Sequence, residues 1–183
     1  MNDDTDTSSK LSRRQVLRGL AGCGAATAVP LIVPSRLLGA DAPSGKVHVA
    51  MIGCGRQAYY ANLSGFFNLP EVRVVAVCDV DRRRAQATKD KVDKHYGDTN
   101  CKLFTDWREA LETDDLDAIM NSTPDHWHAI ISLAAIAKGL HVSCEKPLTR
   151  YLAEGRMLAD AARRKGVVFR TDTECRSHGY MIK

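Results

Sequence analysis

Short apolar runs alternate with longer segments of helical spacing from Lys46 onward. The apolar runs have the length of strands, and they include "KVHVAMI", "EVRVVAVC", "LDAIM", "LHVSC" and "VVF". The segments between them, such as "RRRAQATKDKVDKHY" and "DHWHAIISLAAIA", have the residue spacing of helices. This alternation predicts an α/β fold over residues 45–171, a Rossmann-type doubly wound parallel sheet with helices on both faces.

Residues 1–42 do not continue this alternation. The segment "SRRQVLRG" places Arg13 and Arg14 before the weakly apolar run "LAGCGAATAVPLIVP". Paired arginines before a modest apolar run are typical of a twin-arginine export signal, and the glycines and Pro30 make the run a poor membrane-spanning helix. We therefore expect an export signal and linker that the Tat export machinery reads, with a periplasmic destination. A disordered leader or a signal anchor is the alternative.

Composition and charge add little to this picture. The chain has 183 residues and a net charge of +4, part of which lies in the first forty residues, so we expect no nucleic-acid partner. The cysteines form no C-x-x-C pair, which gives no indication of a zinc or redox motif. We expect the cysteines to be small buried thiols. A disulfide is the alternative in an oxidising compartment. The six cysteines are Cys23, Cys54, Cys78, Cys101, Cys144 and Cys175.

The first candidate site is the segment "GCGRQA", which follows a predicted strand and opens a predicted helix. In this G-x-G-x-x-A pattern Gly53 permits a tight turn, Gly55 lets the backbone approach a pyrophosphate, and Ala58 allows close packing of helix on strand. Asp79 ends the second predicted strand, where a carboxylate can accept hydrogen bonds from an adenosine ribose. The pattern predicts a dinucleotide site whose candidate residues here are Gly53, Gly55, Arg56, Gln57 and Asp79.

Asp79 favours NAD, because its negative charge would oppose the 2′-phosphate of NADP. Arg82 and Arg83 follow closely, and their guanidinium groups could instead accept that phosphate. We interpret them as the exposed first turn of a helix, so NAD is the expected cofactor and NADP the alternative.

The segments "NSTPDHWHA" and "GLHVSCEKPL" together resemble the Gfo/Idh/MocA oxidoreductases, the family of glucose–fructose oxidoreductase and inositol dehydrogenase. The resemblance runs from about Lys46 to Ser177. It implies that Glu145 contacts the nicotinamide end of the cofactor and that Lys146 exchanges a proton with a sugar or polyol substrate while hydride moves to or from the ring. It also implies that Pro147 fixes the backbone of Lys146, and a cis peptide bond before the proline is one way to do so. The remaining residues expected to shape or line this crevice are Thr123, Pro124, Asp125, His126, Trp127 and His128.

Four of these residues also have a plainer interpretation. His126 and His128 could be surface histidines, and we expect no metal because a third ligand is not evident. Trp127 could belong to the core, and Lys146 alone would suit a solvated strand end.

The resemblance further implies a second, α+β substrate domain, which we expect to be largely absent, with residues 172–183 as its truncated start. Truncation is favoured over a stand-alone nucleotide-binding half, because the second domain is expected to follow at this boundary. The short chain is therefore expected to be inactive. We expect an oligomer only when the second domain is present. His178 is not favoured as a catalytic residue. The alternatives are a non-catalytic nucleotide-binding remnant and an NAD-dependent glycosidase, although the resemblance implies valine in such glycosidases where this chain has Lys146.

Overall fold

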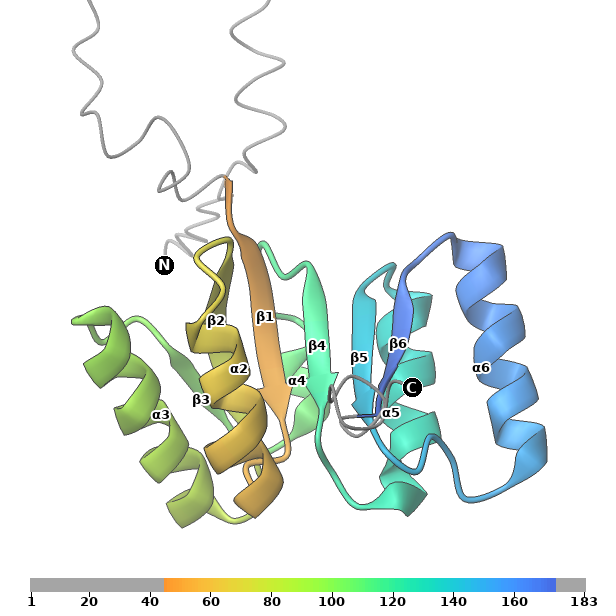
Figure 1. Cartoon of the computed structure of the whole chain (residues 1–183), viewed down its shortest axis with the longest axis horizontal. Coiled ribbons are helices and arrows are strands. Elements are labelled where there is room, and N and C mark those ends of the chain that lie inside the picture. The colour runs from red at the N-terminus through yellow and green to blue at the C-terminus, as the bar shows by residue number, and fades with distance from the viewer. Residues whose placement is uncertain (1–44, 174–183) are drawn as a thin grey trace, which may run out of the picture. The chain divides into compact units, whose positions relative to one another are not determined.

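Six parallel strands form one sheet in the computed structural model, which describes residues 45–173 (Figure 1). Their order across the sheet is β3-β2-β1-β4-β5-β6, so the chain winds outward from β1 in both directions and the order reverses between β1 and β4. This order confirms the predicted Rossmann-type sheet. The strands are β1 (Val47–Ile52), β2 (Val72–Cys78), β3 (Lys102–Phe104), β4 (Ala118–Asn121), β5 (His141–Glu145) and β6 (Phe169–Asp172).

Alternate residues of the strands point to opposite faces of the sheet, and each face has its own core. On β1, Ala50 and Ile52 pack into one cluster with residues of α4, α5 and α6, while Val49 and Met51 pack into a second cluster with residues of η3, α2 and α3. The central strands are therefore buried on both sides, as their continuous apolar character predicts. The helices are η3 (Ala58–Asn62), α2 (Leu63–Phe67), α3 (Arg82–Tyr96), α4 (Trp107–Ala110), α5 (Asp125–Ala137) and α6 (Leu152–Lys165).

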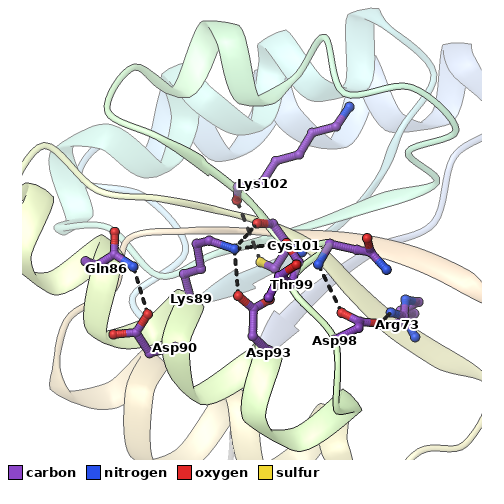
Figure 2. A network of polar contacts seen from close by, with 10 residues as sticks. Arg73, Gln86, Lys89, Asp90, Asp93, Asp98, Thr99, Cys101 and Lys102 are labelled. Atoms are coloured by element: carbon purple, nitrogen blue, oxygen red, sulfur yellow. Dashed lines mark hydrogen bonds and ion pairs between the residues drawn. The ribbon is translucent and has the colours of Figure 1, made fainter.

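A polar network joins the end of α3 to the segment that leads into β3 (Figure 2). The ammonium group of Lys89 donates to Oδ2 of Asp93 at 2.6 Å and to the backbone oxygen of Cys101 at 2.7 Å. A third, longer bond of 3.3 Å reaches the oxygen of Thr99. Because the side chain of Lys89 is only 21% exposed, these three acceptors compensate for lost hydration of its charge. The network lies in the part of the fold that brings β3 alongside β2.

The helix after the glycine turn departs from the expected regular α-helix. Residues Ala58–Asn62 form a π-helical segment that continues directly into α2. Asn62, at the end of this segment, is 8% exposed and takes part in the site described below. At the other end of the domain, β6 extends to Asp172, one residue beyond the expected limit.

Several expectations concern residues outside the described range. The twin-arginine segment, Cys23, Cys175 and His178 lie outside residues 45–173. Within that range, no helix combines the length and apolar character needed to cross a membrane.

Candidate cofactor and active site

Gly53 lies where the ends of three strands meet. Its amide donates to the oxygen of Cys78 on β2 at 2.8 Å, and the amide of Ser122 donates to the oxygen of Ile52 on β1 at 2.7 Å. Gly53 has a φ of +89°, and a Cβ atom there would lie 2.7 Å from the backbone of Ser122. The fold itself therefore requires glycine at this position.

Gly55 differs from Gly53, because the fold does not require it. A Cβ atom at Gly55 would meet no other atom within 4 Å, although the residue lines the cleft described below. Its carbonyl accepts from the amide of Tyr59 at 2.9 Å, so Gly55 leads directly into the helical segment. Open space above a glycine at a helix N-terminus fits the close approach of a phosphate to the backbone.

Asp79 joins the end of β2 to this glycine turn. Its Oδ2 accepts from the amide of Cys54 at 2.7 Å, and its Oδ1 accepts from the amide of Asp81 at 2.8 Å. Each bond uses one of the lone pairs of a carboxylate oxygen, which leaves further acceptor capacity on both oxygens. Asp79 can therefore hold the turn and accept from a ribose hydroxyl at once.

A cleft of about 540 Å³ opens along these strand ends. It lies at the carboxyl edge of the sheet beside the β1–β4 reversal, which is where open α/β sheets bind ligands. Of the predicted residues, those that line the cleft are Gly53, Gly55, Arg56, Gln57, Asp79, Thr123, Pro124 and Trp127.

The same cleft contains residues that the sequence analysis missed. Arg84 lines it, whereas Arg82 and Arg83 do not, and the side chain of Arg83 is 94% exposed. The segment Thr105–Arg108, just after β3, also lines the cleft. The sequence contains a signal for this segment, because residues that follow a parallel strand lie at the same edge of the sheet as Asp79.

Asn121, at the end of β4, shapes the Thr123–Pro124 turn. The side chain of Asn121 is fully buried. Its Oδ1 accepts from the hydroxyl of Thr123 at 2.7 Å, and its Nδ2 donates to the oxygen of His128 at 3.2 Å. One amide side chain therefore ties the turn to the first turn of α5.

The residues from Asp125 to His128 separate into three environments. Asp125 and His126 are exposed and adjacent, with Oδ1 of Asp125 accepting from the amide of His126 at 2.8 Å. Trp127 is 37% exposed and lines the cleft. His128 is 1% exposed, with Nδ1 2.7 Å from the oxygen of Pro147 and Nε2 2.8 Å from the oxygen of Thr123. The expectation that the His128 ring lines the crevice is corrected by these contacts, because both ring nitrogens face backbone oxygens in the interior.

Glu145 and Lys146 end β5 with opposite exposure. Glu145 is 5% exposed, and Oε1 accepts from Nδ2 of Asn62 at 3.0 Å. Its Oε2 accepts from the amide of Lys146 at 3.1 Å. Lys146 is exposed, and the Lys146–Pro147 peptide bond is cis. The structure thus presents the lysine outward from the strand end, while the neighbouring glutamate is held in the interior by Asn62, which the sequence analysis missed.

The thiols of the site are not arranged as nucleophiles. Burial raises the pKa of the Cys54 and Cys78 thiols to about 12. They therefore remain protonated at neutral pH, which removes the reactive thiolate form. Among residues 45–173 there is also no group of three histidine, cysteine or carboxylate side chains that could hold a metal ion.

Comparison with known proteins agrees with this arrangement. Residues 47–173 match the Gfo/Idh/MocA model, described as an oxidoreductase family with an NAD-binding Rossmann fold. The chain belongs to this family. Residues 10–30 match the twin-arginine translocation signal, which supports the export signal predicted there.

Relatives are about a third identical to this chain over the matched region. D-glucoside 3-dehydrogenase of Escherichia coli is 32% identical over 129 residues, covering 70% of this chain and 35% of that enzyme. Inositol 2-dehydrogenase of Salmonella paratyphi B is 32% identical over 124 residues, covering 67% of this chain and 34% of the enzyme. A glycosyl hydrolase family 109 protein of Solibacter usitatus is 32% identical over 155 residues, covering 79% of this chain and 35% of that protein. The chain thus spans about a third of the length of these relatives.

Solved structures agree in fold. The 3-ketoreductase KijD10 of Actinomadura kijaniata, in complex with NADP, has 26% identity and a TM-score of 0.66, with 74% of this chain and 41% of that chain covered. A dehydrogenase of Chromobacterium violaceum has 28% identity and a TM-score of 0.68, with 75% of this chain and 38% of that chain covered.

Proposed function

We propose that this chain is the dinucleotide-binding part of an exported NAD(P)-dependent oxidoreductase that acts on a hydroxyl or carbonyl group of a sugar or polyol. The observation that carries the proposal is that the Gly53–Gly55 turn, Asp79 and Lys146 follow the carboxyl ends of parallel strands in one family-typical sheet. The named activities of the relatives on D-glucosides and inositol support the substrate class.

The cleft fits a dinucleotide at its pyrophosphate and ribose positions. Open space over Gly55 suits the pyrophosphate, with Arg56 and Gln57 at the start of the following helix. The spare acceptor capacity of Asp79 suits the ribose hydroxyls and favours NAD over NADP. Arg84 and Arg108 line the same cleft, and they are the residues through which a 2′-phosphate would be accommodated if NADP is the cofactor.

At the other end of the site, Lys146 is proposed to exchange the proton of the substrate oxygen. When bound, the dinucleotide supplies the hydride acceptor or donor. Thr123 and Pro124 form one wall of the cleft, and Trp127 adds an apolar surface. Asp125 and His126 remain proposed contacts at the exposed rim of this turn. In this proposal Glu145 holds the amide of Lys146 through Oε2 and contacts the nicotinamide end of the dinucleotide, because one bond on each carboxylate oxygen leaves further acceptor capacity.

A two-stage experiment tests the proposal. First, the 183-residue chain is titrated with NADH and NADPH, and the nucleotide released by heating the purified protein is identified. Second, the chain is extended with the second domain of D-glucoside 3-dehydrogenase and assayed with D-glucosides and inositols. We expect turnover that is lost in Lys146→Ala with dinucleotide affinity retained. Absence of dinucleotide binding would contradict the cofactor assignment, and activity that survives Lys146→Ala would contradict the role of the lysine.

An NAD-dependent glycosidase is the second candidate. It is supported by the glycosyl hydrolase family 109 relatives, which match as much of this chain as the dehydrogenases do. Aryl glycosides distinguish the two in the extended enzyme, because release of the phenol reports hydrolysis and net NADH formation reports oxidation. Binding of NAD without either reaction would favour a non-catalytic nucleotide-binding protein.

The proposed location is the periplasm, reached through the Tat export machinery. Residues 10–30 carry the matching signal. This route suits a protein that folds and acquires its dinucleotide before export.

A further inference from the structure

The position of Lys146 depends on contacts beyond its own strand. Glu145 is the last residue of β5, where it pairs with Asp172 of β6. From Lys146 to Arg150 the chain has left the sheet, so ladder hydrogen bonds no longer fix it. A lysine that exchanges a proton needs a defined place, because a displacement of about 1 Å can reduce turnover by roughly 10²-fold.

The ring of His128 connects this segment to Thr123, which lines the cleft. Its Nδ1 lies 2.7 Å from the oxygen of Pro147, next to the lysine, and its Nε2 lies 2.8 Å from the oxygen of Thr123. A carbonyl oxygen only accepts, a neutral imidazole donates from one nitrogen and an imidazolium donates from both. At least one of the two loops is therefore held by a donated hydrogen bond in every protonation state of the ring.

An apolar residue would fill this buried place in α5 at lower desolvation cost, so the polar ring calls for an explanation. The two oxygens that it meets both belong to loop residues, at the T-P turn after β4 and at the segment after β5. The first of these loops lines the cleft, and the second carries Lys146.

Glu145, on the other side of Lys146 along the chain, is held by hydrogen bonds of its own. Nδ2 of Asn62 donates to Oε1 of Glu145 at 3.0 Å and to the hydroxyl of Ser122 at 2.9 Å. Oε2 of the same glutamate accepts from the amide of Lys146 at 3.1 Å. The lysine therefore lies between one residue fixed from the π-helical segment and one fixed from α5.

We propose that His128 is a positioning residue for Lys146, acting through the carbonyl of Pro147, with Asn62 holding the other side through Glu145. The inference rests on the proposed role of Lys146 in proton exchange. It assigns His128 to the geometry of the lysine and gives it no contact with the cofactor.

Amide hydrogen exchange in the 183-residue chain tests the held segment without any need for catalysis. We expect His128→Ala to raise the exchange rate of the Lys146 amide about tenfold, the effect of losing roughly one hydrogen bond. The matched control is His141→Ala. His141 lies at the other end of β5, where its Nδ1 accepts from the amide of Val168 at 2.9 Å, so the control also loses one histidine–backbone bond. It should leave the Lys146 amide unchanged.

Two conservative variants separate positioning from general packing. The amide nitrogen of asparagine can replace Nδ1 of histidine, whereas that of glutamine replaces Nε2. His128→Asn should therefore restore slow exchange at Lys146 through Pro147, and His128→Gln should restore only the bond to Thr123. In the extended enzyme, His128→Gln should lower kcat about 10–100-fold with the dinucleotide Kd unchanged.

The outcomes are distinguishable from failure of the proposed function. Fast exchange of the Lys146 amide in the unaltered chain would overturn the inference, as would equal behaviour of His128→Asn and His128→Gln. If His128→Ala does not fold, the asparagine and glutamine variants decide the question. If the extended enzyme is inactive, the proposed function fails and the exchange measurement alone decides whether His128 holds the segment.

Discussion

Replacing each glycine of the G-x-G turn with alanine should separate folding from dinucleotide binding. In Gly53→Ala, the new Cβ would lie 2.7 Å from the backbone of Ser122, at a residue whose φ is +89°. The left-handed conformation costs about 1–2 kcal/mol and overpacking adds about 1–3 kcal/mol. We therefore expect a loss of about 2–5 kcal/mol in the free energy of unfolding, measured by urea denaturation.

Gly55→Ala should weaken dinucleotide binding and leave the stability of the fold intact. The added methyl meets no protein atom within 4 Å, so the fold should be unchanged or slightly more stable. The methyl would instead occupy space proposed for the pyrophosphate. An overpacking cost of about 1–3 kcal/mol raises the Kd for NADH about 5–150-fold.

Gly65→Ala provides the control for the Gly55 variant. Gly65 lies in α2, a Cβ there also meets no atom within 4 Å, and the residue does not line the cleft. This variant should gain about 0.5–1 kcal/mol of stability and bind NADH normally. An unchanged Kd in Gly55→Ala, or a destabilisation as large as that of Gly53→Ala, would refute the reasoning.

Three further predictions concern Asp79, Lys89 and the twin-arginine segment. Asp79→Asn keeps an acceptor for the Cys54 amide and removes the charge, so the preference for NADH over NADPH should narrow in fluorescence titrations; equal affinities in the unaltered chain would contradict this. Lys89→Met should lower the free energy of unfolding by about 1–3 kcal/mol without changing the Kd for NADH, because its network lies away from the cleft lining. Replacing Arg13 and Arg14 with lysine should retain the precursor in the cytoplasm on cell fractionation, and normal delivery would exclude the twin-arginine route.

The sheet and the glycine turn could be predicted because their causes are local. A continuous apolar run such as Val72–Cys78 requires burial on both faces, and Gly53 followed by Gly55 at a strand end satisfies a backbone requirement. The strand order then places Asp79 and Lys146 at one edge without further information.

The contacts that hold the site could not be predicted in the same way. Asn62 and Glu145 are 83 residues apart, and His128 and Pro147 are 19 apart, so no short pattern reports that they meet. The histidine motif indicated the neighbourhood of the site, but it could not distinguish a ring directed at a cofactor from one directed at two carbonyls. Arg84 was missed for a related reason, since which of three successive arginines faces the cleft depends on the phase of α3.

Burial of the cysteines predicts a loss of stability in alkali. Desolvation raises the pKa of the Cys144 thiol from 9.0 to about 12, and the thiol is fully buried. Between these two values the unfolded chain releases the proton and the folded chain keeps it, so unfolding is favoured as the pH rises, whereas below pH 9 the thiol contributes no pH dependence. At pH 10 the contribution of one such thiol is about 1 kcal/mol. Urea unfolding at pH 8 and pH 10 should therefore show a smaller alkaline loss in Cys144→Ala than in the unaltered chain, whatever the two stabilities are at pH 8. Identical losses would show that the thiolate is tolerated inside the fold, and the buried thiols could then no longer be regarded as inert.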